Sequence, residues 1–150
     1  MNLTDGTPKN GTMHDWLHSM GKTGDLADII VATLSLASVN YGVSKVRFSE
    51  FYELFARLEE EFPSLIPKLG AKQTGGDTYS KTLATALESA LRLGVRIANP
   101  RFQFLEVPRP IGQRNLERLQ KRAGEKFIED LKDAAKYMAN RVNKESDVIQ

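Results

Sequence analysis

One stretch, Asp77–Val107, limits the possible folds most, because it predicts a helix that runs directly into a two-stranded hairpin. Thr78 or Ser80 can cap this helix, since a side-chain oxygen there accepts a hydrogen bond from a free amide of the first turn. Gly94 follows the last periodic residue, where a left-handed residue commonly ends a helix. The apolar positions recur on one helical face: Leu83, Ala84, Leu87, Ala90 and Leu91.

The hairpin is predicted from two short runs, Val95–Ala98 and Phe102–Val107, which are rich in β-branched and aromatic residues. Asn99 and Pro100 lie between the runs. They suit a turn, because Asn favours the first position and Pro presets φ at the second. The chain therefore changes from helical to strand periodicity within a few residues.

Before this unit, the sequence from Asp25 to Val39 is apolar on nearly every side, which suits a helix buried by other elements or by a second subunit. Val43–Phe48 alternates apolar and polar residues and predicts a short strand. Ser49 is the expected cap of the next helix, and residues 71–77 have the composition of a loop. The buried stripe of that next helix is Phe51, Leu54, Phe55 and Leu58.

After the hairpin, Val107–Pro110 should be extended, because Pro restricts both itself and the residue before it. Gln113–Val142 then predicts the longest helix, about 45 Å at 1.5 Å per residue. This length exceeds what a small domain needs to cover its own core, so part of the apolar stripe is expected to pack on a second copy. The stripe consists of Leu116, Leu119, Ala123, Phe127, Leu131, Ala134, Met138 and Val142.

This order of elements resembles a winged helix-turn-helix domain with a C-terminal dimerisation helix, an arrangement shared by several bacterial regulator families. The resemblance is one of pattern and covers Gly24–Val142; its third helix is entered and left through Thr78, Tyr79, Ser80, Leu83, Leu87, Leu91, Gly94 and Val95. It implies a mainly α fold with a small β-hairpin wing. Residues 1–23 would form a flexible N-terminal arm with a possible short helix, 24–110 the winged-helix domain, and 111–150 the long C-terminal dimerisation helix.

One feature departs from that pattern. A simple helix-turn-helix joins its second and third helices by three or four residues. Here Pro63–Asp77 separates them. This longer connection leaves room for a domain that binds protein in place of DNA.

The net charge is only +2, but the charges are unevenly distributed along the 150 residues. Residues 1–42 carry two basic and four acidic residues, whereas residues 101–126 carry seven basic and three acidic ones. This asymmetry favours an anionic partner met by a local patch. The chain contains no cysteine, which fits a cytoplasmic location, and no apolar run approaches the roughly 20 residues of a membrane span.

Candidate DNA contacts lie on the third helix, the wing and the start of the long helix. A helix that enters a major groove needs donors and small residues on its exposed face, although an ordinary solvated face has the same composition. Glu88 shares that face and would repel phosphates. Wing arginines are natural probes of phosphates or the minor groove. The candidates are Lys81, Thr82, Thr85 and Arg92 on the helix, Arg96 and Arg101 on the wing, and Arg109 and Arg114 after it.

Other polar groups are interpreted more simply. Arg118 and the later basic residues of the long helix are expected to form a solvated face. His14 and His18 are four residues apart, but two ligands do not make a metal site. No hydrolase, Rossmann or Walker motif occurs, so neither an enzyme nor a cofactor is expected.

The leading hypothesis is therefore a homodimeric DNA-binding protein, most simply a small transcriptional regulator. The alternative is a protein-interaction or assembly module that kept the winged-helix scaffold without binding DNA. Fold-level analogy is a weak argument for function, so the two hypotheses must be separated by the properties of the surface.

Overall fold

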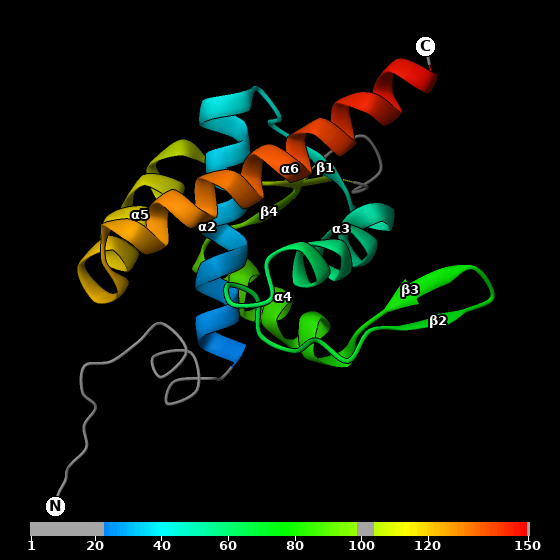
Figure 1. Ribbon diagram of the computed structural model, residues 1–150. Helices are drawn as coiled ribbons and strands as arrows, with labels where there is room; N and C mark the ends of the chain where they lie inside the picture. Colours follow the sequence, from blue (N-terminus) through cyan, green and yellow to red (C-terminus); the bar gives the residue numbers. More distant parts are fainter. Residues whose placement is uncertain (1–22, 99–103, 150) are drawn as a thin grey trace, which may run out of the picture.

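The computed structural model describes residues 23–98 and 104–149 (Figure 1). Within these ranges the chain forms five α-helices and two small antiparallel sheets. The expected N-terminal arm with His14 and His18, and the expected turn with Arg101, lie outside the described residues. The elements are α2 (Thr23–Tyr41), β1 (Val46–Arg47), α3 (Phe48–Glu61), β2 (Lys72–Thr74), β3 (Asp77–Tyr79), α4 (Lys81–Leu93), β4 (Arg96–Ala98), β5 (Phe104–Glu106), α5 (Arg109–Ala123) and α6 (Glu125–Ile149).

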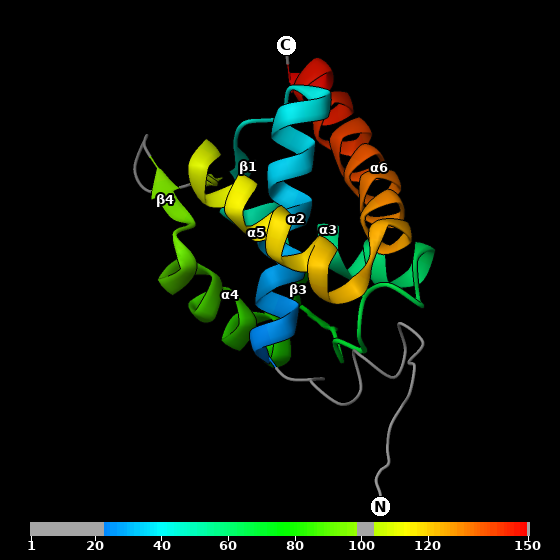
Figure 2. The same cartoon turned by 90° about the vertical axis from the view of Figure 1, so that its left-hand side faces the viewer.

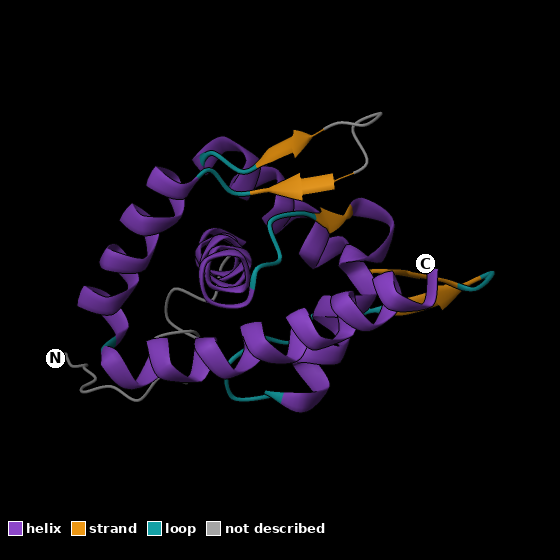
Figure 3. Cartoon of the chain, turned by 90° about the horizontal axis from the view of Figure 1, so that it is seen from above, coloured by secondary structure: helices purple, strands orange, loops and turns teal. Residues whose placement is uncertain are grey.

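Helix α2 is the centre of the molecule. Every residue from 26 to 37 is buried, and α2 packs against α4, α5 and α6. In Figure 3, where α2 is seen along its axis, the other helices surround it. An apolar surface on all sides of a helix requires such a cover. The burial predicted for this segment is confirmed, and the cover comes from the chain itself.

Helix α3 places Phe51, Leu54, Phe55 and Leu58 in the core, which confirms the predicted stripe. Its start differs from the prediction. The N-cap is Arg47 and makes no side-chain capping bond, whereas Ser49 lies inside the first turn. The predicted cap was therefore wrong: the helix begins directly at the end of β1, two residues earlier than expected.

Helix α4 begins and ends as the sequence predicts. The Ser80 hydroxyl accepts a hydrogen bond from the Leu83 amide at 3.0 Å and donates one to the Leu69 carbonyl at 2.6 Å. The same hydroxyl therefore caps α4 and fixes the segment that precedes it. Gly94 ends the helix with a φ of 126°, a conformation that residues with a side chain rarely adopt.

The main sheet has the strand order β1-β5-β4, so β1 extends the predicted hairpin to three strands. Val46 pairs with Leu105 and Ile97 pairs with Leu105 from the other side. Val46 and Leu105 are both buried, because residues directly opposite each other on neighbouring strands lie on the same face of the sheet. The intervening polar residues consequently point away from the core.

Residues 71–77, predicted as a loop, contain most of a second hairpin. Strand β2 pairs with β3, with Lys72 opposite Tyr79 and Thr74 opposite Asp77. Gly75 and Gly76 form the two-residue turn, both with positive φ. Two adjacent positive φ values suit a hairpin turn and favour Gly. The loop prediction was wrong, and the hairpin projects from the helices (Figure 1).

The predicted single helix at Gln113–Val142 is two helices. α5 begins at Arg109, inside the segment expected to be extended, and Gly124 interrupts the helical path with φ 93° and ψ 169°. α6 then turns back and crosses α2, against which it packs (Figure 1). Most of the apolar stripe is buried in the chain's own core, which removes the argument that its length requires a second copy: Leu119, Phe127, Leu131, Ala134 and Met138.

Candidate nucleic-acid interface

The exposed face of α4 carries the predicted helical candidates. Leu83, Ala86, Leu87 and Ala90 are buried against the core. The opposite face is therefore exposed to solvent from the first turn of the helix to the last. Glu88 is exposed on this face. The four helical candidates are exposed there too: Lys81, Thr82, Thr85 and Arg92.

Two contacts modify the hydrogen-bonding capacity of this region. The Thr85 hydroxyl donates to the Lys81 carbonyl at 3.0 Å, so its oxygen keeps its lone pairs for another donor. The Arg96 guanidinium, at the start of β4, lies 3.1 Å from a Glu106 carboxylate oxygen. Because this pair is largely exposed, its two partners can separate at little cost. Arg96 thus remains available to an anion only in competition with Glu106.

The outward face of the three-stranded sheet carries a cluster that the sequence interpretation missed. The Lys45 ammonium is 5.8 Å from the centroid of the Phe104 ring, and the Arg47 guanidinium carbon is 6.0 Å from it. Both distances suit a cation over an aromatic face. Arg47 is also the direct cross-strand partner of Phe104. We call Lys45, Arg47 and Phe104 the sheet-face cluster.

A signal for this cluster was present in the sequence. The alternation across Val43–Phe48 puts Lys45 and Arg47 on the same side of the strand, opposite the buried Val46. Their proximity to Phe104 depends on β1 pairing with β5, over a separation of more than fifty residues. The alternation could therefore have identified the two cations, whereas their aromatic partner required the tertiary structure.

The structure brings some of the predicted residues together and separates others. Helix α4 continues into β4 along one side of the molecule (Figure 2), so Arg92 and Arg96 belong to consecutive elements. Arg96 and Arg109 line one pocket of about 350 Å³. Arg114 lines another groove together with Leu93. The expected Arg109–Arg114 pair of phosphate contacts is thus divided between two depressions.

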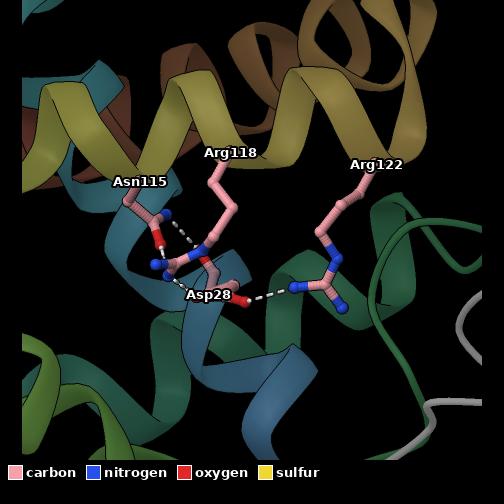
Figure 4. A network of polar contacts seen from close by, with 4 residues as sticks. All are labelled: Asp28, Asn115, Arg118 and Arg122. Carbon is pink, nitrogen blue, oxygen red and sulfur yellow. Dashed lines mark hydrogen bonds and ion pairs between the residues drawn. The ribbon is translucent and has the colours of Figure 1, made fainter.

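Arg118 has a different role from the solvated one predicted for it (Figure 4). Its guanidinium donates to Asp28 Oδ1 at 2.6 Å and to the Asn115 side-chain oxygen at 2.9 Å. Arg122 approaches Asp28 Oδ2 at 3.4 Å, and the Asn115 amide donates to the Asp28 carbonyl at 2.9 Å. Arg118 is exposed, as predicted, but the prediction missed this pairing: Asp28 is buried in α2 and its charge requires a partner. This network joins α5 to α2.

Among the residues that the structure describes, two side chains have a shifted pKa. Burial raises the pKa of Tyr52 above its usual value, and the nearby Tyr79 hydroxyl and Glu88 carboxylate act in the same direction. The Tyr52 and Tyr79 rings lie 5.2 Å apart between centroids. On α6, a hydrogen bond to Asp130 raises the pKa of Lys126. Only the first of these shifts involves the α4 face, through Glu88.

Neither a metal cluster nor a membrane span is found in the part of the chain that the structure describes. Across residues 23–98 and 104–149, no three His, Asp or Glu side chains are grouped so that they could hold a metal ion. No helix in the same ranges combines the length and apolar character needed to cross a membrane.

Comparisons with known proteins give no assignment. No family model matches the chain, and neither a curated protein nor a solved structure matches it. The chemistry of the described surface is therefore the basis for a functional hypothesis. That surface offers exposed cations and hydroxyls on α4, three cations and an aromatic ring on the sheet, and a polar pocket beside them.

Proposed function

We propose that this protein binds DNA as a small cytoplasmic transcriptional regulator of the winged-helix type. In this proposal Lys81, Thr82, Thr85 and Arg92 of α4 face bases or phosphates. The sheet-face cluster and Arg96 hold the adjacent phosphate backbone. Arg101, outside the described residues, remains the predicted contact at the wing tip, and Arg109 and Arg114 remain predicted phosphate contacts.

The order of elements supports this proposal. Helix α2, strand β1, helix α3, helix α4 and the hairpin β4–β5 follow one another in the order on which the resemblance to a winged helix was based. The sheet order β1-β5-β4 joins the first strand to the hairpin. The inserted hairpin β2–β3 is the main departure, and it lies between α3 and α4.

The observation that carries the proposal is the sheet-face cluster. Two cations beside an aromatic ring provide both attraction to phosphates and a surface on which a base or sugar can pack. Arg96 is paired with Glu106, and Glu106 follows Phe104 on the same face of β5. The sheet thus presents three cations and one carboxylate on its outward face, directly after α4.

Fluorescence anisotropy of a labelled DNA duplex with 5′-hydroxyl ends tests the proposal, at low and at moderate salt. Binding should weaken steeply with salt, because each phosphate contact releases counterions. Lys45→Ala with Arg47→Ala should weaken binding and reduce the logarithmic salt slope by roughly 2, about 0.9 for each lost contact. Arg96→Ala with Arg101→Ala should have a similar effect.

Lys136→Ala is the matched control, since Lys136 is an exposed cation on α6 away from the sheet. It should leave both the affinity and the salt slope unchanged. No binding at micromolar protein in low salt would exclude the DNA proposal. Equal weakening by the control and the cluster variants would show only a general effect of net charge.

A protein-interaction or assembly module is the second candidate, and two observations favour it. Glu88 lies on the exposed face of α4, where it would repel phosphates. The hairpin β2–β3 projects from the helices and offers a surface that DNA binding by α4 does not use (Figure 1). This candidate would be supported if the protein bound no DNA and if replacing the hairpin abolished its binding to a protein partner.

The homodimer predicted from the sequence remains a proposal. Its first argument no longer holds, because the apolar stripe of the C-terminal helices is buried in the same chain. The large exposed apolar residues in the described ranges are Val39, Tyr79 and Leu93. Sedimentation equilibrium of the full chain decides between monomer and dimer, and Leu93→Ser tests whether that residue lies in the contact.

A further inference from the structure

A polar pocket of about 350 Å³ lies where the end of α2, the base of the hairpin β4–β5 and the start of α5 meet. Its size falls at the lower end of the range for small-molecule sites, about 300–1,000 Å³. Hydroxyl and charged side chains line it together with Val39, Val107 and Pro108, so it is more polar than most ligand pockets, which are largely apolar. The residues used in the argument below are Ser35, Ser38, Ser44, Arg96, Glu106 and Arg109.

Ser35 is the most informative of these residues. It is only 3% exposed, and its hydroxyl makes no hydrogen bond to any residue in the described ranges. A buried hydroxyl without a partner is unfavourable, and most buried polar groups have one. The hydroxyl lies beside Gly112, where an added Cβ would be only 2.1 Å from Ser35 Oγ. The absence of a side chain at Gly112 thus leaves room for the Ser35 hydroxyl, a donor that no described residue uses.

The N-terminal end of α5 borders the same pocket through Pro108 and Arg109. No side chain caps this helix. The first amides of a helix lack intrahelical partners and carry a partial positive charge, which favours an anion. Arg109 adds a full positive charge at this end, and its exposed guanidinium pairs with no group in residues 23–98 or 104–149.

The remaining charged pair restricts the kind of ligand. Glu106 would repel an anion, but Arg96 lies 3.1 Å from its carboxylate and offsets its charge. With Arg109 the pocket therefore has one cation in excess. The Glu106 carboxylate can accept hydrogen bonds from ligand hydroxyls, and Ser38 and Ser44 can donate or accept them.

We propose that this pocket binds a small phosphate monoester that carries hydroxyl groups. The Arg109 guanidinium, the backbone amides of Arg109 and Ile111, and the Ser35 hydroxyl bind the phosphate, since Pro110 has no amide hydrogen. Glu106 and the other serines bind the hydroxyls. Arg96 and Arg109 line the pocket and are also proposed DNA contacts, whereas the sheet-face cluster lies outside the pocket lining, so the Lys45 and Arg47 variants test DNA binding alone. The phosphate could belong to a free metabolite or to the 5′ end of a nucleic acid, which share this chemistry.

Isothermal titration calorimetry of the full chain tests the proposal with two probes, inorganic phosphate and ribose 5-phosphate. We expect saturable binding of ribose 5-phosphate with a Kd below about 1 mM. Inorganic phosphate should bind more weakly, because it has no hydroxyl-bearing sugar to fill the pocket. Arg109→Ala and Ser35→Ala should each weaken binding on the order of tenfold, the loss expected for a hydrogen bond to a charged group.

Ser35→Ala also separates a ligand role from a structural one. Because the hydroxyl has no partner in the described structure, its removal should leave the unfolding midpoint of the ligand-free protein unchanged or slightly raised. Lys121→Ala is the control: Lys121 is an exposed cation on the same helix that does not line the pocket, so it should leave phosphate binding unchanged. No saturable binding of either probe, or equal binding by the wild type and both pocket variants, would overturn the proposal.

A pair of short single-stranded oligonucleotides, one with a 5′-phosphate and one with a 5′-hydroxyl, distinguishes the two sources. Tighter binding of the phosphorylated form, lost in Ser35→Ala, assigns the pocket to a nucleic-acid end. Binding of ribose 5-phosphate without that preference assigns it to a small molecule. The duplex with 5′-hydroxyl ends contains no monoester, so failure of the DNA proposal and failure of this one are observed separately.

Discussion

Asp28 illustrates how a single residue can determine the packing of a helix. Its side chain is only 8% exposed and lies within an otherwise largely apolar helix. A charge in this position needs a partner, because its transfer from water is costly. Arg118 and Arg122, ninety and ninety-four residues later, meet this need. The network therefore specifies which face of α5 contacts α2.

Arg118→Ala should lower the free energy of unfolding by about 2 kcal/mol. The substitution leaves the buried Asp28 carboxylate with only the longer Arg122 contact, at 3.4 Å. Urea denaturation measures the change. Arg114→Ala, one turn earlier on α5, should change stability by no more than about 0.5 kcal/mol. Equal stability of the two variants would mean that the network makes no net contribution.

Tyr52 should make stability depend on pH in the alkaline range. Its pKa in the folded protein lies above the ordinary value of 10.0, mainly because of burial. The folded state therefore holds this proton more tightly than the unfolded state does. The resulting stability is fully present below about pH 10 and is lost as the pH rises through the higher, folded-state pKa.

Tyr52→Phe removes this proton, so the variant should lose less stability than the wild type between pH 9 and pH 11. Urea denaturation at several pH values gives the two slopes, and Tyr137→Phe on α6 serves as a control for loss of a tyrosine hydroxyl elsewhere in the protein. Parallel slopes for Tyr52→Phe and the wild type would contradict this explanation.

At the scale of elements, Gly124 decides the architecture of the C-terminal third. With φ 93° and ψ 169°, it occupies a region essentially restricted to glycine. The chain can therefore reverse between α5 and α6, and both helices can pack on α2. A continuous helix of the predicted length would carry half of its apolar residues away from this core.

Gly124→Ala should lower the free energy of unfolding by about 1–3 kcal/mol, because alanine is strained in this conformation. Thermal denaturation followed by circular dichroism measures the loss. Gln120→Ala, an exposed substitution on α5, controls for a change in helix propensity. If Gly124→Ala were as stable as the wild type, the break could not depend on the backbone freedom of glycine.

Local patterns predicted those elements whose signals lie close together in the sequence. The α3 stripe and the ends of α4 at Ser80 and Gly94 follow from helical spacing and capping. The hairpin β2–β3 was missed because Gly75 and Gly76 are also typical of a loop, and short polar strands lack a clear alternation. The break at Gly124 was missed because the apolar spacing continues across it.

The same distinction applies to the candidate site. Helical periodicity placed the exposed face of α4 correctly, since the buried positions of one helix define its opposite face. It could not pair Arg118 with Asp28 or bring Phe104 to Lys45, because both contacts join distant segments. Contacts of this kind depend on tertiary packing and have no local pattern.

At the scale of the whole molecule, α2 should be the most protected element. Residues 26–37 are buried on all sides, so their amides can exchange with solvent only when the surrounding helices separate. Their exchange free energies should equal the global free energy of unfolding. The hairpin β2–β3 should exchange much faster, since two strands alone are marginally stable.

Native-state hydrogen exchange measured by NMR tests this expectation across the chain, and urea denaturation supplies the global value for comparison. Exchange in α2 as fast as in β2–β3 would show that the surrounding helices open independently of one another.

The central position of α2 also has a consequence for synthesis. The ribosome completes α2 well before it reaches α6. Residues of α6 that cover α2, such as Ala139, follow about a hundred residues later. At translation rates of about 5–20 residues per second, the most apolar helix waits on the order of 5–20 s for its cover. During this interval the nascent chain exposes surface on which chaperones, or other nascent chains, can bind. Loss of α6 by premature termination would make that exposure permanent, so the yield of folded protein depends on completion of this helix.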